Sequence, residues 1–310
     1  MKSKTRNLAL GCLAALGLLF AVSTPAQRFQ NPLNAHPPMA VSGGVTGSAA
    51  QQLHRSDVSS PDVTSACTYK FTSGAGATYL QFCVSVNGNI VEFESPAGVE
   101  QINQGGIAEG YGFCDQVPEN GYYDYAYGDS GNWNAPVKLS QTATSVKIER
   151  TTSDGVFTLT QTFTSVAGDN PYAKILMSLK NNSAVTKGVA LYRYADSDPG
   201  NAAQTDTYPD FVENGDGTNQ SGFSYVPYSS AVSPEYGLML QRVGPPTPAS
   251  ANTPPQEGWA NNGSDGPAAC DSFEFQTSPV TDLDDSIMYE WTFNIEKNQT
   301  VNVTSRYITF

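Results

Sequence analysis

Apolar and polar residues alternate along much of this chain, and this alternation most constrains its fold. Between residues 146 and 193, apolar side chains recur mostly at every second position in runs of about ten residues. Turn-forming residues separate the runs at 153–155, 168–171 and 181–183, and no segment shows convincing helical periodicity with caps. The pattern predicts an all-β fold, a large antiparallel β-sandwich. The alternating apolar residues are Val146, Ile148, Phe157, Leu159, Phe163, Ala173, Ile175, Met177, Leu179, Val189 and Leu191.

Two cysteines flank the first predicted hairpin. Residues 67–72 and 78–83 have strand-like composition, and a glycine-rich turn centred on Ala75 joins them. This register places Cys67 opposite Cys83, where a cross-strand disulfide is sterically possible. The same register predicts two further pairs, Tyr69 with Gln81 and Phe71 with Tyr79.

A second hairpin follows directly. Asn87–Gly88 is the strongest short signal for a two-residue hairpin turn. It predicts that Val84 lies opposite Val91 and that Phe82 lies opposite Phe93, which gives the hairpin one apolar face.

The remaining two cysteines, Cys114 and Cys270, pair by elimination once Cys67 is joined to Cys83. A metal or redox site is the rival interpretation, but it lacks Cys-x-x-Cys spacing and a nearby histidine. We therefore expect a single disulfide-stapled sandwich domain over residues 64–310, with a long surface loop at 243–269. Segments 287–295 and 301–310 should form a closing hairpin.

The first 26 residues have the pattern of a secretory signal. Lys2, Lys4 and Arg6 precede an apolar stretch, and small residues lead to expected cleavage after Ala26. Residues 27–63 are rich in Pro, Gly and Ser, which predicts a disordered linker. We expect a secreted or periplasmic protein with no membrane span.

Both histidines, His36 and His54, precede residue 55. Because histidine is the usual general base and the commonest metal ligand, its absence from 55–310 excludes Ser-His-Asp chemistry and most zinc sites. The formal net charge of the chain is −13, which disfavours nucleic acid as a partner. Carboxylate chemistry, oxygen-ligated metals or no catalysis remain.

Three segments carry a resemblance to known proteins. Residues 83–98, 110–114 and 191–196 resemble a group of secreted bacterial proteins to which no activity is assigned. More loosely, residues 146–196 resemble the strand-turn-strand rhythm of large carbohydrate-active sandwiches of the mutarotase type. That likeness implies a β-sandwich, but those proteins often use histidine with a carboxylate, so no catalytic residue carries over.

Acidic residues follow the strand that ends near residue 195. Asp196 and Asp198 precede a glycine turn, and further acids follow downstream. Clustered oxygen ligands in an irregular loop suit calcium, so a structural calcium site is one interpretation. A solvated acidic loop is the other.

Arg193 continues the alternation of Val189 and Leu191, which places it on the inward face near a strand end. A buried guanidinium requires a carboxylate, and Asp196 or Asp198 could supply it. Arg150 stands in a similar position. Such arginines either grip a ligand or close the rim of the sandwich with ion pairs.

A tyrosine-rich segment is the strongest candidate for ligand binding. Tyr123, Tyr125 and Tyr127 alternate, so on a strand they would share a face, and Trp133 follows nearby. Sugar rings stack on flat aromatic faces. Tyrosines also favour strands and fill cores, which is the alternative.

The sequence therefore predicts a non-catalytic, exported β-sandwich that binds glycans or cell-envelope polymers. Its candidate ligand-binding residues are Tyr123, Tyr125, Tyr127, Trp133 and Arg193. The alternatives are a carbohydrate-active hydrolase or lyase that uses paired carboxylates, and a structural envelope protein. No cofactor other than calcium is expected.

Overall fold

The computed structural model describes residues 66–102, 108–200, 210–213, 221–226, 236–248, 253–262, 269–270 and 285–309. The predicted signal and the whole of the predicted linker lie outside these ranges. Within them, no helix is long and apolar enough to cross a membrane.

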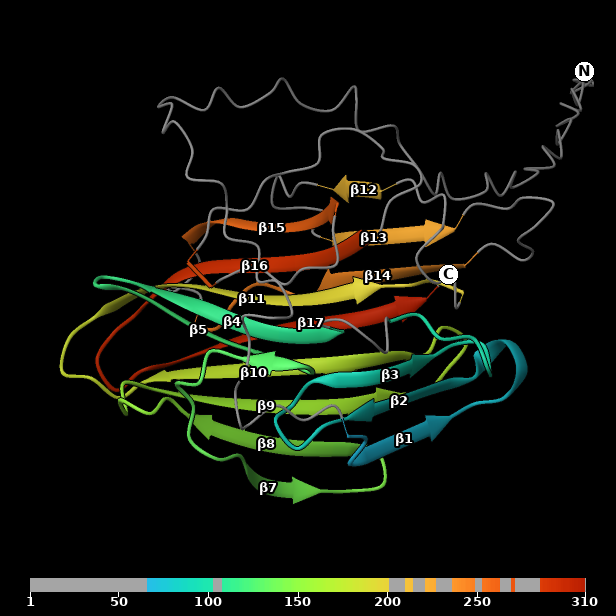
Figure 1. The fold of residues 1–310 in the computed structure, drawn as a ribbon, viewed down its shortest axis with the longest axis horizontal. Coiled ribbons are helices and arrows are strands. Elements are labelled where there is room, and N and C mark those ends of the chain that lie inside the picture. Colours follow the sequence, from blue (N-terminus) through green and yellow to red (C-terminus); the bar gives the residue numbers. More distant parts are fainter. Residues whose placement is uncertain are drawn as a thin grey trace, which may run out of the picture. The chain divides into compact units, whose positions relative to one another are not determined.

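The described part of the chain is built of antiparallel strands in three sheets, which confirms the predicted all-β fold. An eight-stranded sheet has the order β12-β13-β14-β17-β10-β9-β8-β7, and Figure 1 shows the run from β17 to β7 side by side. Its strands are β7 (Val137–Gln141), β8 (Ser145–Thr151), β9 (Phe157–Val166), β10 (Tyr172–Asn181), β12 (Asp210–Glu213), β13 (Ser221–Val226), β14 (Tyr236–Arg242) and β17 (Thr300–Thr309).

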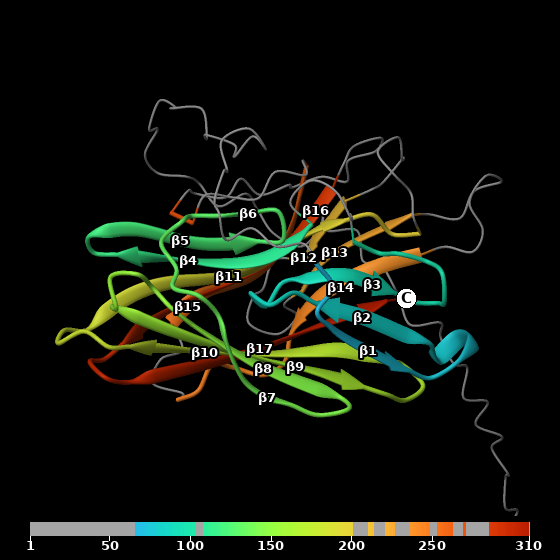
Figure 2. The same ribbon diagram turned by 60° about the horizontal axis from the view of Figure 1, so that its bottom comes forward.

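A six-stranded sheet has the order β15-β16-β11-β4-β5-β6, and Figure 2 shows β6, β5, β4 and β11 in sequence. Its strands are β4 (Glu109–Gln116), β5 (Glu119–Tyr125), β6 (Gly128–Asp129), β11 (Lys187–Ser197), β15 (Thr253–Asn262) and β16 (Asp285–Ile295). Strand β15 falls inside the segment that the sequence predicts as a long loop.

A three-stranded sheet of β1 (Tyr69–Ser73), β2 (Leu80–Val84) and β3 (Ile90–Glu94) completes the fold. It contacts the eight-stranded sheet through hydrogen bonds from Ser165 to Ser73 and from Thr309 to Ser95.

The predicted alternation is confirmed along the central strands. On β9 and β10 the apolar side chains are buried at every second position, while their neighbours are mostly half-buried. These side chains form the core together with the inward side of the six-stranded sheet. Burial of this many apolar side chains is the main stabilising contribution to the fold.

The predicted closing hairpin is wrong. Strand β16 pairs with β11 and β15, whereas β17 pairs with β10 and β14 in the other large sheet. The short turn Glu296–Gln299 carries the chain from one sheet to the other. Both β16 and β17 bury one apolar face. Their alternating pattern therefore fits two strands paired in one sheet and equally fits two strands that face each other across the core from different sheets.

Both disulfide pairings predicted from the sequence are confirmed. The Cα atoms are 5.4 Å apart in Cys67–Cys83 and 4.9 Å apart in Cys114–Cys270. The register predicted for the first hairpin is wrong, because Phe71 lies opposite Phe82 and not opposite Tyr79. A 3-10 turn, η2 (Gly76–Thr78), lengthens the connection and shifts the pairing.

The second hairpin is confirmed in part. Phe82 lies opposite Phe93 as predicted, but a bulge after Cys83 places Val84 opposite Ile90 instead of Val91. The connection between β2 and β3 is therefore longer than a two-residue turn. Its amide nitrogen at Ser85 donates to the carbonyl of Asn89, 2.8 Å away.

Candidate functional site

The connection between β2 and β3 is buried in the interior, although it carries an Asn-Gly sequence typical of surface turns. The exposed fraction is 2 % for Asn87 and 0 % for Asn89. Asn87 Nδ2 donates to Asp124 Oδ2 at 3.2 Å, and Asn89 Nδ2 donates to the carbonyl of Asp124 at 3.0 Å. The hydroxyl of Tyr111 donates to the carbonyl of Asn87 at 2.9 Å. These bonds satisfy polar groups that would be costly to bury without partners.

Arg193 lies beside this buried turn. Its guanidinium forms an ion pair with Glu109, with one N–O distance of 2.8 Å, and donates to Gln161 Oε1 at 2.7 Å. It also donates to the carbonyl of Gly88 at 3.3 Å and stands 5.0 Å from the ring centroid of Phe163. Its side chain is fully buried. Arg193 thus ties the turn, β4 and the eight-stranded sheet together.

Glu109 is as deeply buried as its partner. Besides Arg193, it accepts hydrogen bonds from the amide of Ile90 at 2.6 Å and from the hydroxyl of Tyr307 at 3.1 Å. Burial raises the pKa of Glu109 to about 7, against the opposing effects of Arg193 and of these two hydrogen bonds.

Arg150 makes a second interior ion pair, with Asp124, and Asp129 lies 3.9 Å away. Its guanidinium stands 5.3 Å from the ring of Trp133 and donates to the carbonyl of Asn134. The sequence pointed to Asp196 or Asp198 as the partner of Arg193, and to a similar strand-end position for Arg150. The actual partners come from β4 and β5, and the alternation of Glu109 with Tyr111 and Phe113 is the signal that could have identified the first of them.

Glu109 and Arg193 lie on the core side of the six-stranded sheet. The other side of this sheet carries an arrangement of tyrosines that the sequence predicted only in part. Across β5, β4 and β11, the register aligns Tyr123 with Gly112 and Tyr192, and Tyr125 with Gly110 and Tyr194. Each row therefore has a tyrosine on both sides of a glycine. We call the four residues Tyr123, Tyr125, Tyr192 and Tyr194 the tyrosine face.

The two glycines make room for the rings. A Cβ atom at Gly112 would lie 2.2 Å from the hydroxyl oxygen of Tyr192, and one at Gly110 would lie 2.6 Å from a ring carbon of Tyr125. The rings therefore lie over the backbone of β4. The hydroxyls of Tyr125 and Tyr192 are hydrogen-bonded at 2.9 Å.

The rings of the tyrosine face also contact one another. Tyr125 lies 5.5 Å from Tyr123 and 5.7 Å from Tyr194 between ring centroids. Burial raises the pKa of Tyr125 well above its ordinary value, with added effects of Tyr192 and Tyr194, so its phenol stays protonated at neutral pH. Tyr123 is half-buried, while the other three are almost fully buried.

The structure places the other predicted binding residues elsewhere. Trp133 is buried against Phe113 and Tyr122 on the inner side of β5, and its indole N–H donates to the carbonyl of Tyr123. Tyr127 lies beyond the end of β5 and is half-buried. Arg193 lies on the inner face of β11. Of the five candidates, only Tyr123 and Tyr125 belong to the tyrosine face, and Tyr192 and Tyr194 were missed although they alternate with Leu191 and Arg193.

Two carboxylates share this side of the sheet. The register sets Glu290 opposite Tyr192, and Asp196 follows Tyr194 by two residues along β11. Asp196 is buried, and its amide donates to the carbonyl of Ala108 at 2.7 Å. Among the residues that the structure describes, no group of three or more acidic, His or Cys side chains could hold a metal ion. Of the four acids downstream of Asp198 in the predicted calcium site, Asp210 and Glu213 lie on β12, and Asp206 and Asp216 fall outside the described ranges.

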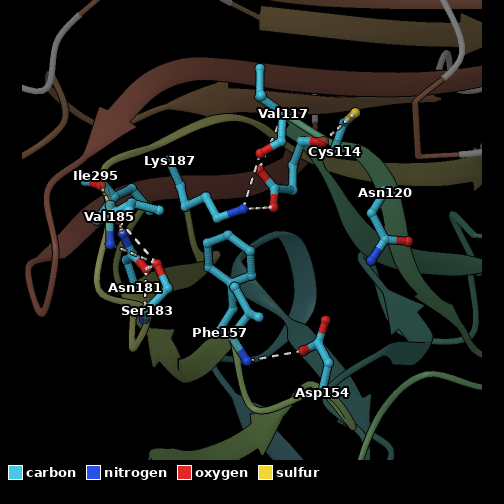
Figure 3. A network of polar contacts seen from close by, with 12 residues as sticks. Cys114, Val117, Asn120, Asp154, Phe157, Asn181, Ser183, Val185, Lys187 and Ile295 are labelled. Carbon is cyan, nitrogen blue, oxygen red and sulfur yellow. Dashed lines mark hydrogen bonds and ion pairs between the residues drawn. The ribbon is translucent and has the colours of Figure 1, made fainter.

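A third polar network closes one end of the sandwich (Figure 3). Lys187 Nζ contacts Asp115 Oδ2 at 2.6 Å and the carbonyl of Val117 at 3.0 Å. Asn181 Nδ2 donates to the carbonyls of Val185 and Ile295 at 2.7 and 3.0 Å. Lys187 thus joins β11 to the end of β4, and Asn181 joins the end of β10 to the end of β16, so we assign the network a structural role.

Comparison with known proteins gives no family and no curated relative: no family model matches the chain, and neither does any curated protein. Solved structures that match include a putative aldose 1-epimerase from Escherichia coli K12, at 11 % identity and a TM-score of 0.39, covering 77 % of this chain and 98 % of that one.

Two larger enzymes also match. One is a bacterial glucoamylase complexed with acarbose, at 12 % identity and a TM-score of 0.45, covering 81 % of this chain and 34 % of that one. The other is a 4-alpha-glucanotransferase from Thermococcus litoralis, at 8 % identity and a TM-score of 0.38, covering 77 % of this chain and 37 % of that one. The chain thus spans about a third of each, and TM-scores below 0.5 carry no functional argument.

Proposed function

We propose that this protein binds glycans, without catalysis, on the tyrosine face of its six-stranded sheet. The observation that carries the proposal is the pair of Tyr-Gly-Tyr rows across β5, β4 and β11. Because the chain has two disulfides, we propose that it works outside the cytoplasm, where disulfides persist.

The tyrosine face has the chemistry that sugars require. The half-buried ring of Tyr123 presents a flat apolar surface, on which the C–H face of a pyranose stacks. Its hydroxyl can donate and accept hydrogen bonds, and behind it the hydrogen bond between the buried hydroxyls of Tyr125 and Tyr192 holds those two rings in fixed positions. A sugar needs this combination of a flat surface and a few oriented polar groups.

Access to the face is through its partly exposed margin. Tyr123 on β5, Ala190 on β11, and Glu290 and Thr292 on β16 are half-buried and share this side of the sheet. We place the first contact of a glycan on Tyr123, with Tyr125 and Tyr192 behind it.

The charges favour one class of glycan. The carboxylates of Glu290 and Asp196 lie on this face, and the described side chains of β4, β5 and β11 contribute no cation to it. Acidic polysaccharides such as polyuronates would be repelled. We therefore propose neutral or amino sugars as ligands.

Binding is preferred to hydrolysis because of the spacing of these acids. Asp196 pairs with Ser286, four residues from Glu290 along β16, which corresponds to about 13 Å at about 3.3 Å per residue. Glycoside hydrolases place their two carboxyl groups about 5 to 9.5 Å apart. The separation along the strand supports a binding site.

The test is a panel of neutral, amino and acidic polysaccharides incubated with the purified protein. Bound polysaccharide is measured by pull-down, and released oligosaccharide by mass spectrometry. Retention of neutral or amino glycans without product supports the proposal. Release of product would favour the carbohydrate-active enzyme, and no retention of any member would favour a structural envelope protein.

A further inference from the structure

The Asn87–Gly88 turn has a chemical consequence that is independent of glycan binding. An asparagine followed by glycine is prone to deamidation, because glycine offers little steric resistance to attack by its own backbone nitrogen. This sequence occurs here in a buried turn and not on the surface. We infer that Asn87 is a deamidation site that folding protects, and that its modification prevents the chain from refolding.

The reaction needs only water. The backbone nitrogen of Gly88 attacks the side-chain carbonyl carbon of Asn87, a C–N bond forms, and ammonia leaves to give a succinimide. Water then opens the ring to aspartate or isoaspartate. One water is consumed and one ammonia is released, with no oxidant or reductant.

The folded structure opposes this attack at both reacting groups. The amide of Gly88 donates to the carbonyl of Ser85 at 3.2 Å, and Nδ2 of Asn87 donates to Asp124 at 3.2 Å. The carbonyl of Asn87 is held by Tyr111, and that of Gly88 by Arg193. The turn therefore cannot rotate into the cyclic geometry without breaking several buried hydrogen bonds.

The products do not fit the native site. An aspartate at position 87 would turn its carboxylate toward that of Asp124, which is 0 % exposed. Two buried carboxylates at hydrogen-bond distance repel each other, and within the part of the chain that the structure describes only Arg150 forms an ion pair with Asp124. Isoaspartate would add a backbone atom beside Gly88, where even a Cβ would lie 2.5 Å from Gln161 Nε2.

The chain contains its own control. Asn120–Gly121 has the same sequence, but Asn120 is exposed on β5, where its side chain donates to the hydroxyl of Tyr122. Because Asn120 is exposed, a carboxylate formed there can turn away from Tyr122 into solvent, so we expect its deamidation to leave refolding unaffected.

The experiment incubates the full chain, with its disulfides intact, in native buffer or in concentrated urea at pH 8 and then dilutes it to refold. Peptide mapping by mass spectrometry measures the one-dalton increase at positions 87 and 120. We expect deamidation of Asn87 to be at least tenfold slower in native buffer than in urea. After refolding, modified Asn87 should be confined to the fraction that fails to refold, while modified Asn120 should be equal in both fractions.

Protection below tenfold at Asn87, or equal amounts of modified Asn87 in the refolded and failed fractions, would overturn the inference. The variants Asn87→Asp and Asn120→Asp give an independent check. The first is expected to lose at least tenfold in yield of folded protein, and the second to match the wild type. Equal yields of the two variants would also overturn it.

Discussion

Replacing Arg193 with methionine should make the stability of this protein fall steeply with pH above 7. In the wild type, burial raises the pKa of Glu109 to about 7, and the largest opposing influence is Arg193. The ordinary value is 4.5, so the folded protein holds one more proton than the unfolded chain between these two values. The wild type therefore loses stability as pH rises through this window, and this group adds no further change above it.

Without Arg193 the pKa of Glu109 rises further. The pH range in which the folded protein holds one more proton than the unfolded chain therefore extends to higher pH. Each pH unit in which the folded variant still holds the extra proton costs about 1.36 kcal/mol. Above pH 7, the Arg193→Met variant is thus expected to lose about 1.36 kcal/mol relative to the wild type for each pH unit over which it keeps this proton. Methionine suits the apolar surroundings, since Phe163 and Met177 lie against the guanidinium.

The assay is urea unfolding followed by tryptophan fluorescence at several pH values from 5.5 to 9. Arg193→Lys retains the charge and should show the pH profile of the wild type. The double variant with Glu109→Gln removes the titrating group and should lose the extra slope. Parallel stability curves for Arg193→Met and the wild type above pH 7 would refute the reasoning.

Three further outcomes are expected. Gly112→Ala places a Cβ against a tyrosine hydroxyl, so it should cost about 1 to 3 kcal/mol in thermal unfolding; an unchanged melting temperature would show that the rings move freely. Removing Cys114–Cys270, with a sequence separation of 156, should cost about 5 kcal/mol, against about 3 kcal/mol for Cys67–Cys83, with a separation of 16; the reverse order in denaturant would contradict this. If the predicted calcium site exists, a chelator should lower the melting temperature, and calcium, but not magnesium, should restore it. An unchanged melting temperature in chelator would refute the calcium site.

Local pattern in the sequence was sufficient for the strands but not for their partners. The alternation of Phe157, Leu159 and Phe163 depends only on which side of one strand is buried, and it appears unchanged in β9. The pattern of β16 and β17 carries the same information, yet they belong to different sheets. Alternation identifies the buried face of a strand but not the sheet that the strand joins.

The contacts of the candidate site also depend on residues that are far apart in the sequence, which local pattern does not predict. Local pattern predicts Asp196 or Asp198 as the partner of Arg193, three or five residues away, but the actual partner Glu109 is 84 residues away in the chain. The turn at Asn87–Gly88 was predicted from two residues, whereas its burial depends on Asp124, more than thirty residues later.

The sequence predicted only the part of the tyrosine face that lies on a single strand. Tyr123 and Tyr125 were expected to share a face because they alternate on one strand. Tyr192 and Tyr194 join them only because β4 lies between β5 and β11 with glycines at the two crossing positions. That arrangement depends on strand order, which no local pattern determines.

The most direct test of glycan binding is a calorimetric titration of Tyr123→Ala with the best-retained neutral or amino glycan of the panel. Tyr79→Ala is the matched control, because Tyr79 is also half-buried but lies beside the three-stranded sheet. We expect Tyr123→Ala to weaken the affinity about tenfold, equivalent to about 1.4 kcal/mol, and Tyr79→Ala to leave it unchanged. Equal affinities of the two variants, with both folded by circular dichroism, would contradict binding on the tyrosine face.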